Sequence, residues 1–149
     1  MKGIYLDHNA TTPPHPAVVE EMRACLEQGW GNPSSIHAHG QTAKRILDLA
    51  RHRVAALVGA EPEEILFTSG GTESDNQALR GGSILRPEGA ILTSAIEHSA
   101  VLDTCKNLAA QGREVRILPV ASNGILDFDA LKAPSNGPVA LVSLMLANN

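Results

Sequence analysis

The second half of the sequence alternates between short apolar segments and longer amphipathic segments, and this alternation limits the possible folds more than any other feature. The apolar segments are short, rich in Val, Ile and Leu, and bounded by turn residues, as buried strands are. Strands that alternate with helices form a largely parallel sheet covered on both faces, which is the α/β class. The expected strands span residues 65–68, 90–93, 115–118 and 139–144.

Helices are expected between these strands. One begins near Thr72, a second follows His98 and ends at Gly112, and a short third helix spans residues 127–132. The polar segment Ser122-Asn123-Gly124 is typical of a turn. The turn and the short helix provide the connection that a parallel sheet needs between two of its strands.

The first half of the chain predicts an arm followed by two helices. Residues 1–14 form an extended N-terminal arm, because the adjacent prolines 13 and 14 prevent a helix there. Apolar residues then recur at helical spacing from Pro16 to Gly29, and again over residues 40–58, with Gly59 as the C-terminal cap. We expect residues 15–149 to belong to one large domain.

Composition excludes several classes of protein. The chain has 149 residues, of which 43% are hydrophobic and 19% charged, so it is globular rather than disordered. Its net charge of −4 and its scarcity of aromatic residues argue against nucleic-acid binding. No apolar run approaches the roughly 18 residues of a membrane span, and the start of the chain lacks a signal-peptide core. We therefore expect a cytoplasmic protein.

The two cysteines form neither a disulfide framework nor a zinc site. Cys25 and Cys105 lie far apart in the sequence, and no Cys-x-x-Cys pair is present. Each falls on the apolar face of an expected helix, where we interpret it as a small core residue. No metal site is expected.

Three polar clusters each follow an expected strand. They are Ser69-Gly70-Gly71-Thr72, Glu97-His98 and Asn148-Asn149. Ligands of parallel sheets bind beyond the carboxyl ends of the strands, so we expect all three clusters along one rim of the sheet.

The first cluster resembles a phosphate-binding turn. Two glycines allow close approach of a ligand, the N–H groups of the following helical turn attract an anion, and Thr72 adds a hydroxyl donor. The alternative is an ordinary tight turn with Thr72 as the N-cap. The turn matches neither the Walker loop nor the dinucleotide fingerprint, so a nucleotide-binding module is disfavoured.

The other two clusters also have a functional and a structural interpretation. His98 can stack on a planar ligand or move a proton near neutral pH, but it can equally be a solvent-facing residue at a helix start. Asn149 can hydrogen-bond a phenolic or carbonyl oxygen, but it can equally be a turn former.

Five motifs in order carry a resemblance to a known family over essentially the whole chain. They are Tyr5-Leu6-Asp7-His8-Asn9-Ala10-Thr11-Thr12-Pro13, Gly31-Asn32-Pro33-Ser34-Ser35-Ile36-His37, Phe67-Thr68-Ser69-Gly70-Gly71-Thr72-Glu73-Ser74, Glu97-His98-Ser99-Ala100-Val101-Leu102 and Ala147-Asn148-Asn149. Together they resemble the cysteine desulfurases of iron–sulfur cluster assembly and nitrogen fixation.

The resemblance implies a fold-type I enzyme dependent on pyridoxal 5′-phosphate (PLP), in the class V aminotransferase group. Its large domain would be a three-layer α/β/α structure with a mostly parallel sheet. Such enzymes are homodimers that convert L-cysteine to L-alanine and pass the sulfur, as a persulfide, to an iron–sulfur scaffold or another acceptor protein. By the same resemblance, Gly71 and Thr72 bind the phosphate, His98 stacks on the pyridine ring and assists proton transfer, and Asn149 lies near the phenolic oxygen.

The resemblance also defines what this chain does not match. No residue corresponds to the family's lysine that holds PLP, to its persulfide cysteine, or to its aspartate beside the pyridine nitrogen. We therefore expect an N-terminal portion of a longer enzyme, inactive alone, with unpaired sheet edges and poor folding in isolation. Two alternatives stay open: another class V enzyme, such as a selenocysteine lyase or an aminotransferase, and a non-catalytic remnant or interaction module.

Overall fold

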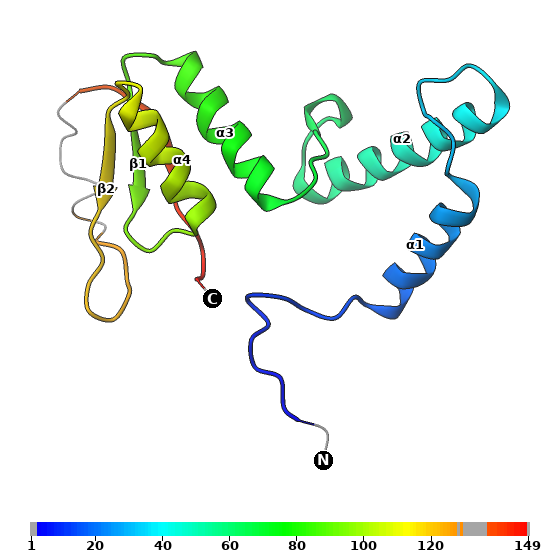
Figure 1. Ribbon diagram of the computed structural model, residues 1–149, viewed down its shortest axis with the longest axis horizontal. Helices are drawn as coiled ribbons and strands as arrows, with labels where there is room; N and C mark the ends of the chain where they lie inside the picture. The colour runs from blue at the N-terminus through cyan, green and yellow to red at the C-terminus, as the bar shows by residue number, and fades with distance from the viewer. Residues whose placement is uncertain (1–2, 128, 130–136, 149) are drawn as a thin grey trace. The chain divides into compact units, whose positions relative to one another are not determined.

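A computed structural model describes residues 3–127, 129 and 137–148. The chain divides into two compact units, here called the N-terminal unit (Met1–Phe67) and the C-terminal unit (Thr68–Asn149). Their elements are coloured along the chain in Figure 1. The N-terminal unit holds α1 (Pro16–Gln28), α2 (Ala38–Val58) and the 3-10 turn η1 (Pro62–Glu64); the C-terminal unit holds α3 (Gly71–Leu85), β1 (Ala90–Ser94), α4 (Ser99–Ala110), β2 (Val115–Leu118) and β3 (Val139–Ser143).

The C-terminal unit is built on a parallel sheet, which confirms the α/β fold class. Its strand order is β2-β1-β3, and β1 pairs in parallel with both neighbours. Every residue of β1 is buried, as expected for the central strand of a parallel sheet. Among the described residues, β2 and β3 form the two edges of this sheet.

Two apolar clusters occupy the two faces of the sheet. On one face, Ile91 packs with Leu79 of α3 and Cys105 of α4, and the two helices lie over this face in Figure 1. On the other face, Leu92 packs with Leu118 and the partly buried Leu126. Side chains of a strand alternate between faces, so β1 contributes to both clusters. Full burial of a side chain such as Leu79 or Ile91 stabilises the unit by about 1.5–3 kcal/mol.

The helices of the N-terminal unit confirm the predicted spans to within two residues. Pro16 occupies the first turn of α1, and His15 caps that helix by accepting a hydrogen bond from the N–H of Ala17. Gly59 ends α2 in the left-handed conformation, with φ of 70°, which a glycine adopts without a steric penalty.

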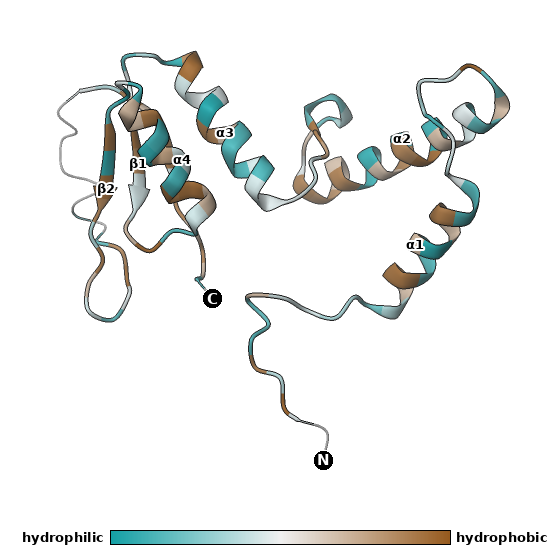
Figure 2. Cartoon of the chain, in the orientation of Figure 1, coloured by the Kyte–Doolittle hydropathy of each residue, from teal (hydrophilic) through white to brown (hydrophobic). Residues whose placement is uncertain are grey.

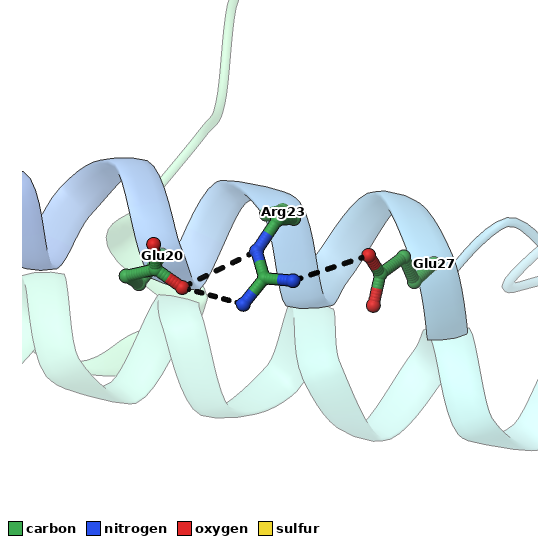
Figure 3. Close-up of polar contacts among 3 residues, drawn as sticks. All are labelled: Glu20, Arg23 and Glu27. Carbon is green, nitrogen blue, oxygen red and sulfur yellow. Dashed lines mark hydrogen bonds and ion pairs between the residues drawn. The ribbon is translucent and has the colours of Figure 1, made fainter.

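Charged residues form ion pairs along α1. Arg23 contacts Glu20 at 2.7 Å and Glu27 at 3.6 Å, one turn away on either side (Figure 3). Pairs at this spacing stabilise a helix by about 0.2–0.5 kcal/mol each. They support α1 locally, since none of its residues is buried among the described residues.

The prediction that Cys25 is a core residue was wrong. Its side chain is exposed, although it lies on the apolar side of α1 as the sequence indicates. Apolar residues form bands along α1 and α2 (brown in Figure 2), and Val18, Met22 and Leu26 are all exposed. A helix that packs against one neighbouring helix leaves much of its apolar stripe in water, so the pattern alone does not establish burial.

The prediction of a strand over residues 65–68 was also wrong. Ile65 has extended dihedrals, but its carbonyl accepts a hydrogen bond from the Arg51 guanidinium of α2, which also lies 5.2 Å from the centre of the Phe67 ring. The segment is extended without a ladder partner in the described part of the chain. The predicted helix over residues 127–132 lies largely outside the described residues.

No helix in the described ranges is both long and apolar enough to cross a membrane.

Candidate functional site

The rim of the sheet in the C-terminal unit holds described residues of all three polar clusters singled out by sequence, namely Thr72, His98 and Asn148. α3 and α4 both begin at the end of the unit where β1 and β3 end (Figure 1). The first turns of two helices and the carboxyl ends of two parallel strands therefore face the same region. Parallel α/β sheets bind their ligands in this region.

The Gly70–Thr72 turn leaves the start of α3 uncapped. Gly70 is the N-cap residue, so the alternative interpretation of Thr72 as the N-cap was wrong, and no side chain caps this helix. The first backbone bond runs from the Ser74 N–H to the Gly70 carbonyl. In the described part of the chain, the other three α-helices are capped by the Nδ1 atom of a histidine. The N–H groups of the first turn of α3 are thus available to an anion.

The exposure of the residues at this turn agrees with anion binding. Gly71 and Thr72 are both exposed, and a Cβ atom built on either Gly70 or Gly71 would meet no heavy atom within 4 Å. The space beside both glycines is therefore open. An alanine at position 71 would fit as well as the glycine.

Glu73 holds the loop that precedes this turn. Its Oε2 atom accepts hydrogen bonds from the Ser69 N–H at 2.7 Å and from the Ser69 hydroxyl at 2.6 Å. These bonds stabilise the charged carboxylate and lower the pKa of Glu73, against a smaller opposing effect of burial. The carboxylate is thereby directed to Ser69.

His98 is the N-cap of α4, with an exposed side chain. Its Nδ1 atom accepts a hydrogen bond of 3.1 Å from the Ala100 N–H, which assigns the proton of the neutral ring to Nε2. One ring edge is anchored by the cap while a face of the ring stays open. This arrangement suits a ring that stacks on a planar ligand.

Side-chain hydrogen bonds join the ends of β1 and β3 beside His98. Glu97 is only 7% exposed, and its Oε1 atom accepts from the Ser94 hydroxyl at 2.6 Å and from the Met145 N–H at 2.8 Å. Asn148 donates its side-chain amide to the Ile96 carbonyl at 2.8 Å. The segment after β3 is therefore fastened to the turn that carries His98. Asn149 itself lies outside the described residues.

A cleft between α3 and α4 opens at the same place. It has a volume of about 380 Å³. Thr72 on one wall faces Ser99 and Ala100 on the other, directly after His98, so the first turns of both helices border one space. The remaining lining residues are Asn76, Arg80, Asp103, Thr104 and Asn107.

The described cysteines and lysines provide no evident nucleophile. Burial raises the pKa of the Cys105 thiol, with a smaller contribution from the Glu97 charge, and the residue is 1% exposed in the core, as predicted. Lys44 pairs with Asp48 at 3.0 Å, and Lys106 pairs with Asp103 at 2.9 Å. Lys2 and Lys132 lie outside the described residues. No cluster of metal ligands occurs in the described part of the chain.

Sequence reasoning missed the structural roles of several polar residues. Glu97 was recognised only as part of a polar cluster, and nothing in the sequence indicates that its carboxylate is buried between two strand ends. His15 and His37 were not recognised as N-caps, since the residues favoured at that position are Ser, Thr, Asp and Asn. Their positions directly before helical segments are the only signal that could have identified them.

Comparison with known proteins places this chain in a family. The family model described as "Aminotransferase class-V" matches residues 4–149. A protein named cysteine desulfurase from Nostoc sp. is 49% identical over 150 aligned positions, which cover 100% of this chain and 38% of that protein. The chain thus spans well under half the length of this relative.

Solved structures show the same similarity. A NifS-like protein superposes with a TM-score of 0.88 at 39% identity, covering 97% of this chain and 40% of the other. A structure described as SspA in complex with cysteine superposes with a TM-score of 0.83 at 32% identity, covering 94% and 41% of the two chains. The likeness therefore extends over both units.

Proposed function

We propose, because the chain belongs to the aminotransferase class-V family, that it is the N-terminal part of a PLP-dependent cysteine desulfurase. In this reaction the carbon–sulfur bond of L-cysteine breaks, the sulfur is transferred to an enzyme thiol as a persulfide, and the carbon skeleton leaves as L-alanine. The relative from Nostoc sp. carries this activity in its name, and the SspA structure contains cysteine.

The observation that carries the proposal is the uncapped start of α3 on the same cleft as the first turn of α4. The phosphate of PLP is a dianion that such a helix start binds well, with the N–H of Gly71 and the N–H and hydroxyl of Thr72 as donors. Thr72 would therefore bind and orient the phosphate.

His98 and Asn149 complete the proposed cofactor site. The open face of the His98 ring would stack on the pyridine ring, and the capped Nδ1 atom would hold the imidazole in one orientation. With Nδ1 occupied, Nε2 is the atom through which His98 would move a proton. Asn149 would donate to the phenolic oxygen of the cofactor. PLP itself supplies an electron sink that stabilises negative charge on the substrate carbon.

The proposal extends to the whole protein. We propose a cytoplasmic homodimer that passes sulfur to an iron–sulfur scaffold or another acceptor protein. These features rest on the family resemblance of the five sequence motifs.

Incubation of the full-length gene product with PLP, L-cysteine and a thiol reductant tests the function. The reductant releases the persulfide sulfur, so we expect equal amounts of alanine and sulfide, together with a yellow protein. Thr72→Val removes the hydroxyl donor and should raise the PLP dissociation constant by about tenfold. A wild-type protein that binds PLP but releases alanine only from L-selenocysteine would instead be a selenocysteine lyase. A colourless wild-type protein after PLP treatment would refute the proposal.

A further inference from the structure

We propose that Glu97 is a positioning residue for the cofactor site, which fastens the segment after β3 to the turn that carries His98. The inference rests on the proposed function. It assigns a role to Glu97, which is not among the residues proposed to contact the substrate or the cofactor.

The geometry of the strand ends shows why a link is needed here. The ladder between β1 and β3 ends at the pair Thr93 and Ser143. After β1 the chain turns at residues 95 and 96, so the backbone of β1 no longer pairs with the segment that follows β3. The Met145 N–H then bonds to the Glu97 carboxylate in place of a backbone carbonyl, across 48 residues of sequence.

The burial of Glu97 makes this link specific. A carboxylate that is 7% exposed loses much of its hydration, and it is tolerated where hydrogen-bond donors compensate for that loss. The Ser94 hydroxyl and the Met145 N–H are two such donors.

The bonds of Glu97 affect both His98 and the segment that follows β3. Glu97 directly precedes His98 in the chain, so its fixed side chain restrains the backbone that leads into the cap of α4. Met145 leads to Asn148, whose side chain bonds to Ile96 on the same turn, and then to Asn149. Removal of the carboxylate should therefore loosen His98 and Asn148 relative to one another while the core of the unit persists.

The test compares Glu97→Ala and Glu97→Gln with Leu108→Val in the full-length protein. Leu108 lies in the core cluster of α4, and its truncation is the control for a general loss of stability. In Glu97→Ala we expect amide exchange at Met145 to rise by about tenfold and the PLP dissociation constant to rise by a similar factor, with a weaker circular dichroism signal from the bound cofactor. Glu97→Gln keeps an acceptor oxygen and should restore both values to within about threefold.

The outcomes separate the two proposals. If amide exchange at Met145 is the same in Glu97→Ala as in wild type, the link itself is refuted, regardless of the PLP affinity. If wild type and Glu97→Ala have the same PLP affinity and the same cofactor dichroism, Glu97 does not position the cofactor site. The same conclusion follows if Leu108→Val, at the melting temperature of Glu97→Ala, loses as much PLP affinity as Glu97→Ala does. Failure of the wild-type protein to take up PLP overturns the proposed function instead.

Discussion

Nδ1 of His98 accepts a hydrogen bond of 3.1 Å from the N–H of Ala100, so one residue both caps α4 and presents an exposed ring at the rim. The two roles can be separated, because an asparagine can cap a helix but cannot stack as an imidazole does.

We expect His98→Asn to keep the stability of wild type to within about 0.5 kcal/mol and to weaken PLP binding by about tenfold. His98→Ala should lose the cap as well, at a cost of about 1 kcal/mol. Chemical denaturation and PLP titration of the two variants measure the two effects. Equal PLP affinity in His98→Asn and wild type would exclude the stacking role.

Gly71 allows a test of its backbone N–H without a change of side-chain chemistry. Gly71 is the first residue of α3, a position where proline is tolerated. Gly71→Pro removes the N–H that would bind the phosphate, whereas Gly71→Ala retains it. We expect the proline variant to bind PLP more weakly by about tenfold.

Gly71→Ala is the matched control for that experiment. It should bind PLP as wild type does and gain about 0.5 kcal/mol of stability, because alanine restricts the unfolded chain and a Cβ atom fits at this position. Circular dichroism of both variants verifies that α3 has formed. Equal PLP affinities for the two variants would show that the N–H of residue 71 does not contact the phosphate.

Glu73 should make stability depend on pH in the acid range. Its pKa is lowered in the folded protein by the two bonds from Ser69, so the folded state favours the charged carboxylate. Such a group stabilises the protein above the unfolded pKa of about 4.3, and that contribution is lost as the pH falls through the folded pKa. Thermal unfolding of wild type and Glu73→Gln between about pH 3 and 7 should show curves that converge at low pH. A pH-independent difference between them would contradict the assignment.

The sequence predicted the central strand of the C-terminal unit well because β1 is buried on both faces. Its apolar start, Ala90-Ile91-Leu92, lies between turn residues and allows few alternatives. The same reasoning failed at Ile65, where an equally apolar segment is held by Arg51 from α2. Hydrophobicity indicates that a segment is extended, but the partner that binds its backbone is a tertiary property.

The part of the candidate site that is formed by backbone groups was predictable from the sequence. The Gly70-Gly71 turn before the predicted helix is visible in the sequence, and it forms the start of α3 without a side-chain cap. The bonds of Glu97 were not predictable, because they depend on the distance between the ends of β1 and β3. Contacts that cross strand ends require the register of the sheet, which no local pattern contains.

The two cysteines should differ sharply in reactivity. Cys105 is 1% exposed with a raised pKa, whereas Cys25 is exposed on α1. The thiolate is the reactive form and needs access to the reagent, so Cys105 should react only when the C-terminal unit opens locally. We expect an aromatic disulfide reagent at neutral pH to modify Cys25 at least about tenfold faster than Cys105 in the native chain. Cys25→Ser removes the fast phase and identifies it, and both thiols should react quickly in denaturant. A fast native reaction at Cys105 would show that α4 does not pack stably on the sheet, and the cap at His98 would then be too mobile to orient a ring.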